Sequence, residues 1–191
     1  MGVMPMFPLG TVLLPGAVLP LHVFEPRYRA LVTVCLAAPA PEFGVTMIER
    51  GSEVGGGDVR TDAGCVARMV QVAETPDGRY AVVAVGVRRV RVVEWLPDDP
   101  YPIAEVDDWP DDHEPVGHER VAASLARVRR AAALAAELGE GGADLSTGVS
   151  DDPVLASYQL CSLAPIGAVD RYRLLRAPGP ATRLDLLDEA L

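Results

Sequence analysis

The sequence contains no lysine, because all 17 of its basic residues are arginine, and it contains no asparagine either. Several mechanisms depend on a lysine amine: phosphate binding by a Walker A motif, Schiff-base formation with a carbonyl, and the Ser-Lys catalytic dyad. The missing residue type therefore excludes Walker-type ATP hydrolysis, Schiff-base chemistry and Ser-Lys proteolysis within this polypeptide.

Cysteine and long apolar runs are also scarce. The three cysteines, Cys35, Cys65 and Cys161, are widely spaced and form no CxxC pair, which is typical of reduced thiols and favours a cytoplasmic location. The apolar stretch 12–21 is broken by proline and glycine, and it is shorter than the roughly 20 residues that span a bilayer. Because the start of the chain lacks a basic segment, we expect no signal peptide.

Basic charge is in deficit, with 27 acidic residues against 17 basic ones and a formal net charge of −10. The segment 97–114 alone holds eight acidic residues and no basic one. Nucleic-acid binding requires cationic side chains that displace phosphate counterions, and we see no extended basic stripe beyond the short cluster of Arg88, Arg89 and Arg91. We therefore expect neither nucleic acid nor an anionic membrane as a partner.

The first two thirds of the chain has the pattern of short strands with one helix. Apolar, valine-rich runs bounded by turn residues predict strands, at 3–14, 19–24, 43–49, 65–74, 79–87, 88–96 and 103–109. Pro26 marks the start of a helix that ends before Pro39, and the glycine-rich segment 49–63 predicts a loop. The turn sequence 75–78 (TPDG) predicts a hairpin. Glycines within the strand pattern, at Gly64 and Gly86, suggest a small barrel.

The last third is helical in pattern. Apolar residues recur at steps of four and three over 119–138, and the glycines at 139, 141 and 142 end this helix. Asp151-Asp152-Pro153 opens a second helix that continues to residue 163. Shorter helices are expected at 168–176 and 182–191. The sequence thus predicts an α+β protein with a β-barrel domain at 1–112 and a helical bundle at 113–191.

Motifs in the barrel region carry a resemblance to a known family. They are MFPL at 6–9, VLLPG at 12–16, LPLHVFEPRYR at 19–29, GCVAR at 64–68, PDGR at 76–79 and VGVRRVR at 85–91. This series closely resembles the Lon N-terminal domain family, also called the Lon substrate-binding domain. The resemblance implies a PUA-like pseudo-barrel followed by a small helical bundle. It is greatest to stand-alone bacterial members that lack the ATPase and protease domains.

The resemblance also implies a function. It suggests a non-enzymatic module without a cofactor that binds unfolded or extended polypeptide segments through an apolar surface or a sheet edge. Such a module would serve as an adaptor in protein quality control, with a protease or chaperone as its partner. The candidate binding residues are His22, Phe24, Arg27, Tyr28, Met47 and Met69. Their residue types favour core packing over ligand contact for the two methionines, Phe24 and Tyr28, and they favour a structural ion pair with Glu25 over ligand binding for Arg27 and Arg29.

Two other function classes stay open from the sequence. A pocket at the junction of barrel and helices would suit a small molecule, and 111–114 (DDHE) with His118 has side chains that can bind a metal. However, Pro115 and Gly117 interrupt any helical ligand spacing, and acidic linkers are commonly just solvated. A hydrolase would need an unrecognised site, because no serine lies in a GxSxG motif and the cysteines occupy apolar contexts.

Overall fold

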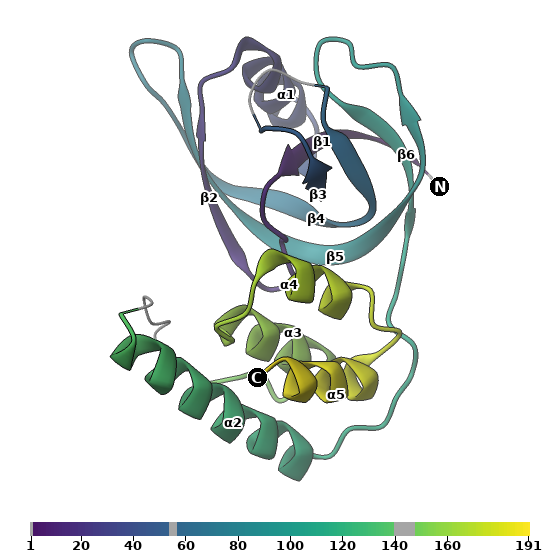
Figure 1. The fold of residues 1–191 in the computed structure, drawn as a ribbon. Coiled ribbons are helices and arrows are strands. Elements are labelled where there is room, and N and C mark those ends of the chain that lie inside the picture. Colours follow the sequence, from purple (N-terminus) through teal and green to yellow (C-terminus); the bar gives the residue numbers. More distant parts are fainter. Residues whose placement is uncertain (1, 54–56, 140–147) are drawn as a thin grey trace. The chain divides into compact units, whose positions relative to one another are not determined.

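The structure, a computed structural model, describes residues 2–53, 57–139 and 148–191. Two compact units make up the chain, Met1–Pro110 and Asp111–Leu191. Strands dominate the first unit and helices form the second (Figure 1), so the α+β fold class predicted from the sequence is confirmed. The domain boundary expected from the sequence follows residue 112.

The described part of the first unit, Met1–Pro110, contains six strands and one helix. They are β1 (Gly2–Leu9), β2 (Val18–Val23), α1 (Pro26–Leu36), β3 (Glu42–Arg50), β4 (Val59–Glu74), β5 (Tyr80–Leu96) and β6 (Ile103–Asp108). Three sequence predictions were wrong in extent: β1 ends at Leu9, β5 is one strand instead of two, and 59–63 belongs to β4 instead of a loop. Residues 54–56 of the expected loop, with two of its glycines, lie outside the described residues.

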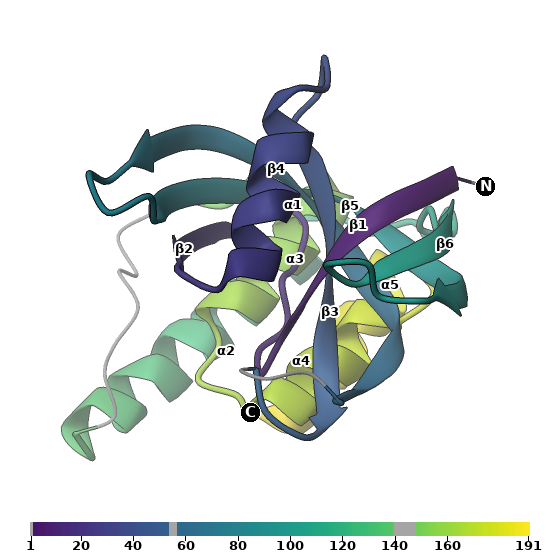
Figure 2. The same cartoon turned by 90° about the horizontal axis from the view of Figure 1, so that it is seen from above.

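The sheet of this unit curls back on itself. Its strand order is β2-β5-β4-β3-β1-β6, and β6 pairs again with β5. The β1–β3 pair is parallel, whereas the other pairs are antiparallel. β5 is long enough, at 17 residues, to pair with β2 and β4 near its start and with β6 near its end. A pseudo-barrel results, with β2 as an edge strand (Figures 1 and 2).

Two glycines permit the tight curvature of this sheet. A Cβ atom on Gly86 would lie 2.3 Å from the carbonyl oxygen of Leu14, and one on Gly64 would lie 2.3 Å from that of Val45. Only a residue without a side chain allows so close a backbone approach. The Gly86 N–H donates to the Ala17 carbonyl at 2.9 Å. This bond anchors the segment that leads into β2 and sets its register on β5.

Helix α1 covers one end of the barrel (Figures 1 and 2). Its buried residues are Tyr28, Leu31, Val32 and Cys35, and they share one core with the inward side chains of the strands. The ring of Tyr28 stacks on that of Phe7 in β1, with centroids 4.0 Å apart. Burial raises the pKa of Tyr28 to about 12. The core thus fixes α1, and with it the short segment that connects β2 to α1.

In its described residues, the second unit, Asp111–Leu191, contains four helices. They are α2 (His118–Glu137), α3 (Pro153–Leu163), α4 (Ala168–Leu175) and α5 (Pro180–Ala190). The Asp152 carboxylate accepts a hydrogen bond from Val154 N–H at 3.1 Å and so caps α3, as its sequence predicts. Gly139, with a φ of 82°, follows the end of α2, while glycines 141 and 142 lie outside the described residues. Across the described part of the chain, no helix is both long and apolar enough to cross a bilayer.

Candidate functional site

His22 and Phe24, both proposed from the sequence, lie together at the end of β2. β2 ends at Val23 and α1 begins at Pro26, so Phe24 sits on the short corner between them, with 53% of its surface exposed. A pocket of about 220 Å³ is lined by His22 and Phe24, by the β4–β5 turn, and by Tyr80 at the start of β5. We call this depression the Tyr80 pocket.

An apolar surface leads to this pocket along the outer face of β2 and β5. The register places Val18 opposite Val85, Pro20 opposite Val83 and His22 opposite Ala81. We call the first two pairs, Val18, Pro20, Val83 and Val85, the apolar strip. Val18 is 65% exposed, and the two β5 valines are half-buried. Strands rise about 3.3 Å per residue. The strip and the Tyr80 pocket together therefore match the length of a short extended polypeptide segment.

The outer edge of β2 is only partly available for strand addition. Along β2, the backbone N–H and C=O groups of successive residues point alternately toward β5 and away from it. Because the Ala17 carbonyl accepts from Gly86 in β5, the groups of Leu19, Leu21 and Val23 also point toward β5. The alternate residues, Val18, Pro20 and His22, therefore direct theirs outward. Proline has no N–H, so it interrupts a ladder along this edge. Side-chain contacts with the strip suit this surface better than continuous β-pairing.

A second pocket, of about 350 Å³, adjoins Tyr80 on the side of α1. It is lined by one face of the helix, with Arg29 and Thr33, and by the ring of Tyr80. We call it the Arg29 pocket. The guanidinium of Arg29 lies against the β4–β5 turn, because a Cβ on Gly78 would be 2.6 Å from its Nη2. Tyr80 thus forms a wall common to both pockets.

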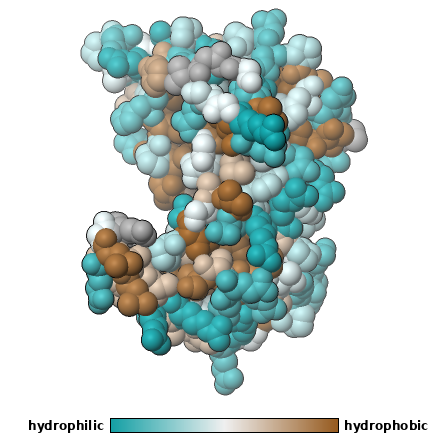
Figure 3. Space-filling view, in the orientation of Figure 1, coloured by the Kyte–Doolittle hydropathy of each residue, from teal (hydrophilic) through white to brown (hydrophobic). Residues whose placement is uncertain are grey.

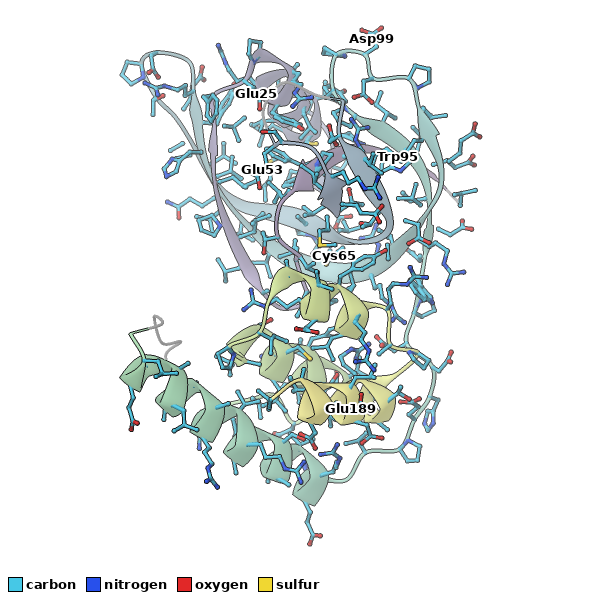
Figure 4. All side chains as sticks on the ribbon, viewed as in Figure 1. Glu25, Glu53, Cys65, Trp95, Asp99 and Glu189 are labelled. Atoms are coloured by element: carbon cyan, nitrogen blue, oxygen red, sulfur yellow. The ribbon has the colours of Figure 1, made fainter. Side chains whose placement is uncertain are left out.

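Arg27 has a local structural partner. Its Nε donates to the Glu25 carboxylate at 3.1 Å, and its Nη2 donates to the Glu53 carbonyl at 3.1 Å. Figure 4 labels both glutamates. The guanidinium also lies 4.4 Å from the centroid of the Tyr28 ring. These contacts fix the corner at the start of α1, as the ion-pair interpretation of the sequence expected for Arg27.

The remaining three candidates from the sequence do not join His22 and Phe24. Tyr28 is 3% exposed and Met69 is 6% exposed, and both belong to the barrel core. Met47 is half-buried on β3, which two strands separate from β2 in the sheet. The packing interpretation of Tyr28 and Met69 explains their positions, so the proposed contact surface below uses His22 and Phe24.

Sequence reasoning missed the contribution of the β4–β5 turn. Thr75, Asp77 and Arg79 line the Tyr80 pocket, and Asp77 is held by Arg79 and by the Thr75 hydroxyl. The TPDG motif correctly predicts the turn, with Gly78 at a φ of 74°. However, its place beside β2 follows from the long-range pairing of β2 with β5, for which no local pattern exists.

Two acidic residues at the start of the second unit, Asp111 and Glu114, accept hydrogen bonds from other parts of the protein. Asp111 accepts hydrogen bonds from Tyr158 and the fully buried Arg183. Glu114 accepts from the N–H of Thr182 at 2.9 Å and from its hydroxyl at 2.7 Å. Among the described residues, no three histidine, cysteine or acidic side chains gather into a metal-binding group. The simple solvated-linker interpretation is therefore wrong for Asp111 and Glu114.

The three cysteine thiols have the properties of unreactive thiols. All are free and buried. Burial raises the pKa of Cys35 to about 11, and it raises those of Cys65 and Cys161 to about 12. Figure 4 places Cys65 within the sheet of the barrel. A nucleophilic cysteine requires a lowered pKa and access to substrate, so none of these thiols is suited to catalysis.

One other apolar surface lies in the second unit. Leu134 and Leu138, at the end of α2, are 53% and 81% exposed. Figure 3 shows hydrophobic side chains gathered there, whereas the visible face of the barrel unit mixes hydrophobic with hydrophilic side chains.

Comparisons with protein families and with solved structures point to the same family over nearly the whole chain. A family model described as the ATP-dependent protease La (LON) substrate-binding domain matches residues 3–191. A crystal structure of a Lon N-terminal domain protein from Xanthomonas campestris is 27% identical, with a TM-score of 0.74 over 99% of this chain and 98% of that one. The N-terminal domain of a Mycobacterium avium complex Lon protease, 20% identical with a TM-score of 0.65, shares the fold and covers 98% of this chain and 97% of that one.

Similar curated proteins are much longer than this chain. Lon protease 2 of Desulfotalea psychrophila is 26% identical over 98% of the chain, but the match covers 24% of that protein. Lon protease 2 of Herpetosiphon aurantiacus is 33% identical over 58% of the chain and is covered over 14% of its own length. The chain therefore spans no more than about a quarter of these relatives.

Proposed function

Because this chain belongs to the family of the LON substrate-binding domain, we propose that it binds extended apolar segments of polypeptides and catalyses no reaction itself. The strip and the Tyr80 pocket are the proposed contact surface. In quality control, such a module would act as an adaptor that presents bound segments to a protease or chaperone. The bound segments, rather than any small molecule, are its substrates in this proposal.

The observation that carries the proposal is the apolar surface next to the pocket. Val18, at 65%, and Phe24, at 53%, are exposed within one short stretch of chain. Exposed apolar side chains that gather beside a depression are characteristic of an interaction surface. A client segment that covers them removes apolar area from water, which supplies a non-directional driving force that tolerates many client sequences.

The size of the Tyr80 pocket favours a side chain as its occupant. Its volume of about 220 Å³ is below the range of roughly 300 to 1,000 Å³ that is typical of small-molecule sites. An apolar side chain of a client could pack there on Phe24 and Tyr80. The imidazole of His22 at the rim would offer a hydrogen bond to the client backbone.

The remaining features of the proposal are supported by the chemistry of the chain. The buried, high-pKa thiols and the absence of lysine support a non-enzymatic role, and free thiols suit the cytoplasm. Arg88 pairs with Glu42 and Asp108, and Arg91 stacks on Trp109. These ion pairs and the stacking contact occupy the basic side chains within the protein. Together with the net charge of −10, they make nucleic acid an unfavourable partner.

The proposal is tested by titrating the protein into a fluorescently labelled, permanently unfolded protein without ATP and following fluorescence polarisation. We expect saturable binding in the micromolar range, at roughly 10 μM, which is ordinary for a weak recognition module. An unchanged polarisation at tenfold higher protein concentration would refute the proposed function.

A matched pair of valine variants locates the binding surface. Val18→Thr places a hydroxyl on the strip, whereas Val93→Thr makes the same isosteric change at a site on β5 that is 49% exposed and outside the strip. We expect Val18→Thr to weaken binding several-fold and Val93→Thr to leave it unchanged. Equal effects of the two changes would mean that the strip is not the contact surface.

A further inference from the structure

Arg29 differs from the other arginines that lie near carboxylates in the barrel unit. Five of those arginines form ion pairs, namely Arg27, Arg60, Arg68, Arg79 and Arg88. The guanidinium of Arg29 has no hydrogen bond or ion pair with any described residue, and its Nε is buried without a partner. A buried polar donor without a partner is costly and requires an explanation.

Among the described residues, no carboxylate forms an ion pair with the Arg29 guanidinium. The Arg29 pocket is lined by Pro26, Ala30, Thr33 and Tyr80 beside the arginine, and none of these carries a carboxylate. The carboxylate at the adjacent turn, Asp77, is already bound by Arg79 and Thr75. A positive, half-buried group in a protein of net charge −10 thus faces an open depression of about 350 Å³.

We propose that Arg29 binds a carboxylate of the client polypeptide, held beside an apolar side chain that occupies the Tyr80 pocket. Tyr80 lines both pockets, so neighbouring groups of one extended chain can enter both together. The planar guanidinium suits a carboxylate because it donates two parallel hydrogen bonds. This inference rests on the proposed function and adds a preference to it.

The carboxylate can come from an acidic side chain or from the end of the client chain. Both present the same planar anion, and both would distinguish acceptable clients from purely apolar segments. The preference also restricts indiscriminate binding, because an apolar segment without a nearby carboxylate leaves the guanidinium unpaired. Recognition would then depend on an apolar residue and a carboxylate at short spacing.

The test uses three fluorescent peptides with one shared apolar core. The first ends in an amide and carries no acid, the second ends in a free carboxylate, and the third ends in an amide but contains one internal glutamate. Charge-assisted hydrogen bonds predict that the native protein binds one or both carboxylate peptides about 10- to 100-fold more tightly than the neutral one. Whichever of the two gains affinity identifies the source of the anion.

Variants assign this preference to Arg29. Arg29→Gln should lose the preference and bind the three peptides with similar affinities, while Arg29→Lys should retain only part of the preference. Arg50→Gln removes one exposed positive charge elsewhere in the unit and should retain the preference in full. A preference that survives Arg29→Gln, or its absence from the native protein, would overturn the inference. Failure of the native protein to bind even the neutral peptide would instead refute the proposed function.

Discussion

Replacing Arg183 by methionine should destabilise the helical unit selectively. Arg183 is fully buried, and its Nε donates to the Leu174 carbonyl at 3.1 Å and its Nη1 to Ser157 at 2.7 Å. Its Nη2 donates to Asp111 and to the Tyr158 hydroxyl. One side chain thus connects the acidic start of the unit with α3, α4 and α5.

The expected loss of stability in Arg183→Met follows from the burial of this ion pair. Without the guanidinium, the Asp111 carboxylate loses its ion-pair partner while its side chain is only 12% exposed. Removing one partner of a buried ion pair costs about 3 to 5 kcal/mol. For a unit of this size, each kcal/mol corresponds to roughly 4 to 8 °C of melting temperature, so the helical transition should fall by at least about 12 °C.

Circular dichroism of the full chain measures this change as loss of the helical signal during heating. The matched control is Arg173→Met, because Arg173 pairs with Glu189 on the surface, with 57% and 60% of the two side chains exposed. An exposed pair contributes about 0 to 1 kcal/mol, so this control should melt nearly as the native protein does. Equal melting temperatures for the two variants would refute the buried-cluster account.

Three further predictions concern the barrel, the thiols and the acid range. Gly86→Ala should destabilise the barrel unit by at least about 1 to 3 kcal/mol in urea unfolding, because the new Cβ would meet the Leu14 carbonyl; an unchanged midpoint would contradict the close approach. Because burial raises the pKa of Cys35 to about 11, its thiol and the other two should react far more slowly with a disulfide reagent in the folded protein than in denaturant. Hydrogen bonds from Thr182 hold the pKa of Glu114 below its ordinary value of 4.5, so its contribution to stability is present above that value and lost as the pH falls through the lowered pKa. The stability difference between native protein and Glu114→Gln should accordingly disappear in acid, and a difference that persists unchanged would exclude this linkage.

The order of the elements could be predicted from local patterns, but some of their limits could not. Proline at position 26 and the helical spacing after it predict α1 correctly, and TPDG predicts the β4–β5 turn. The split predicted within β5 was wrong because a bend in a barrel needs no break in a strand. The residues of 59–63 form the start of β4 because they pair with β3 and with the distal part of β5, which are long-range contacts.

The candidate site was predictable only in part, for a similar reason. His22 and Phe24 follow directly from the corner between β2 and α1, so sequence proximity brings them together. Tyr80 approaches them through pairing with Val23, across more than fifty residues of chain. The unpaired state of Arg29, beside the paired Arg27, depends on which carboxylates the fold brings within reach, and residue type alone does not contain that information.

Amide chemical shifts of the labelled protein, recorded while an unlabelled apolar peptide is added, test the central claim most directly. We expect the peptide to shift resonances of residues 18–24 and 80–85, which form the strip and the Tyr80 pocket, with little change at the end of α2. Shifts confined to other surfaces, such as the surroundings of Leu134 and Leu138, or no shifts at saturating peptide, would contradict the proposed binding site.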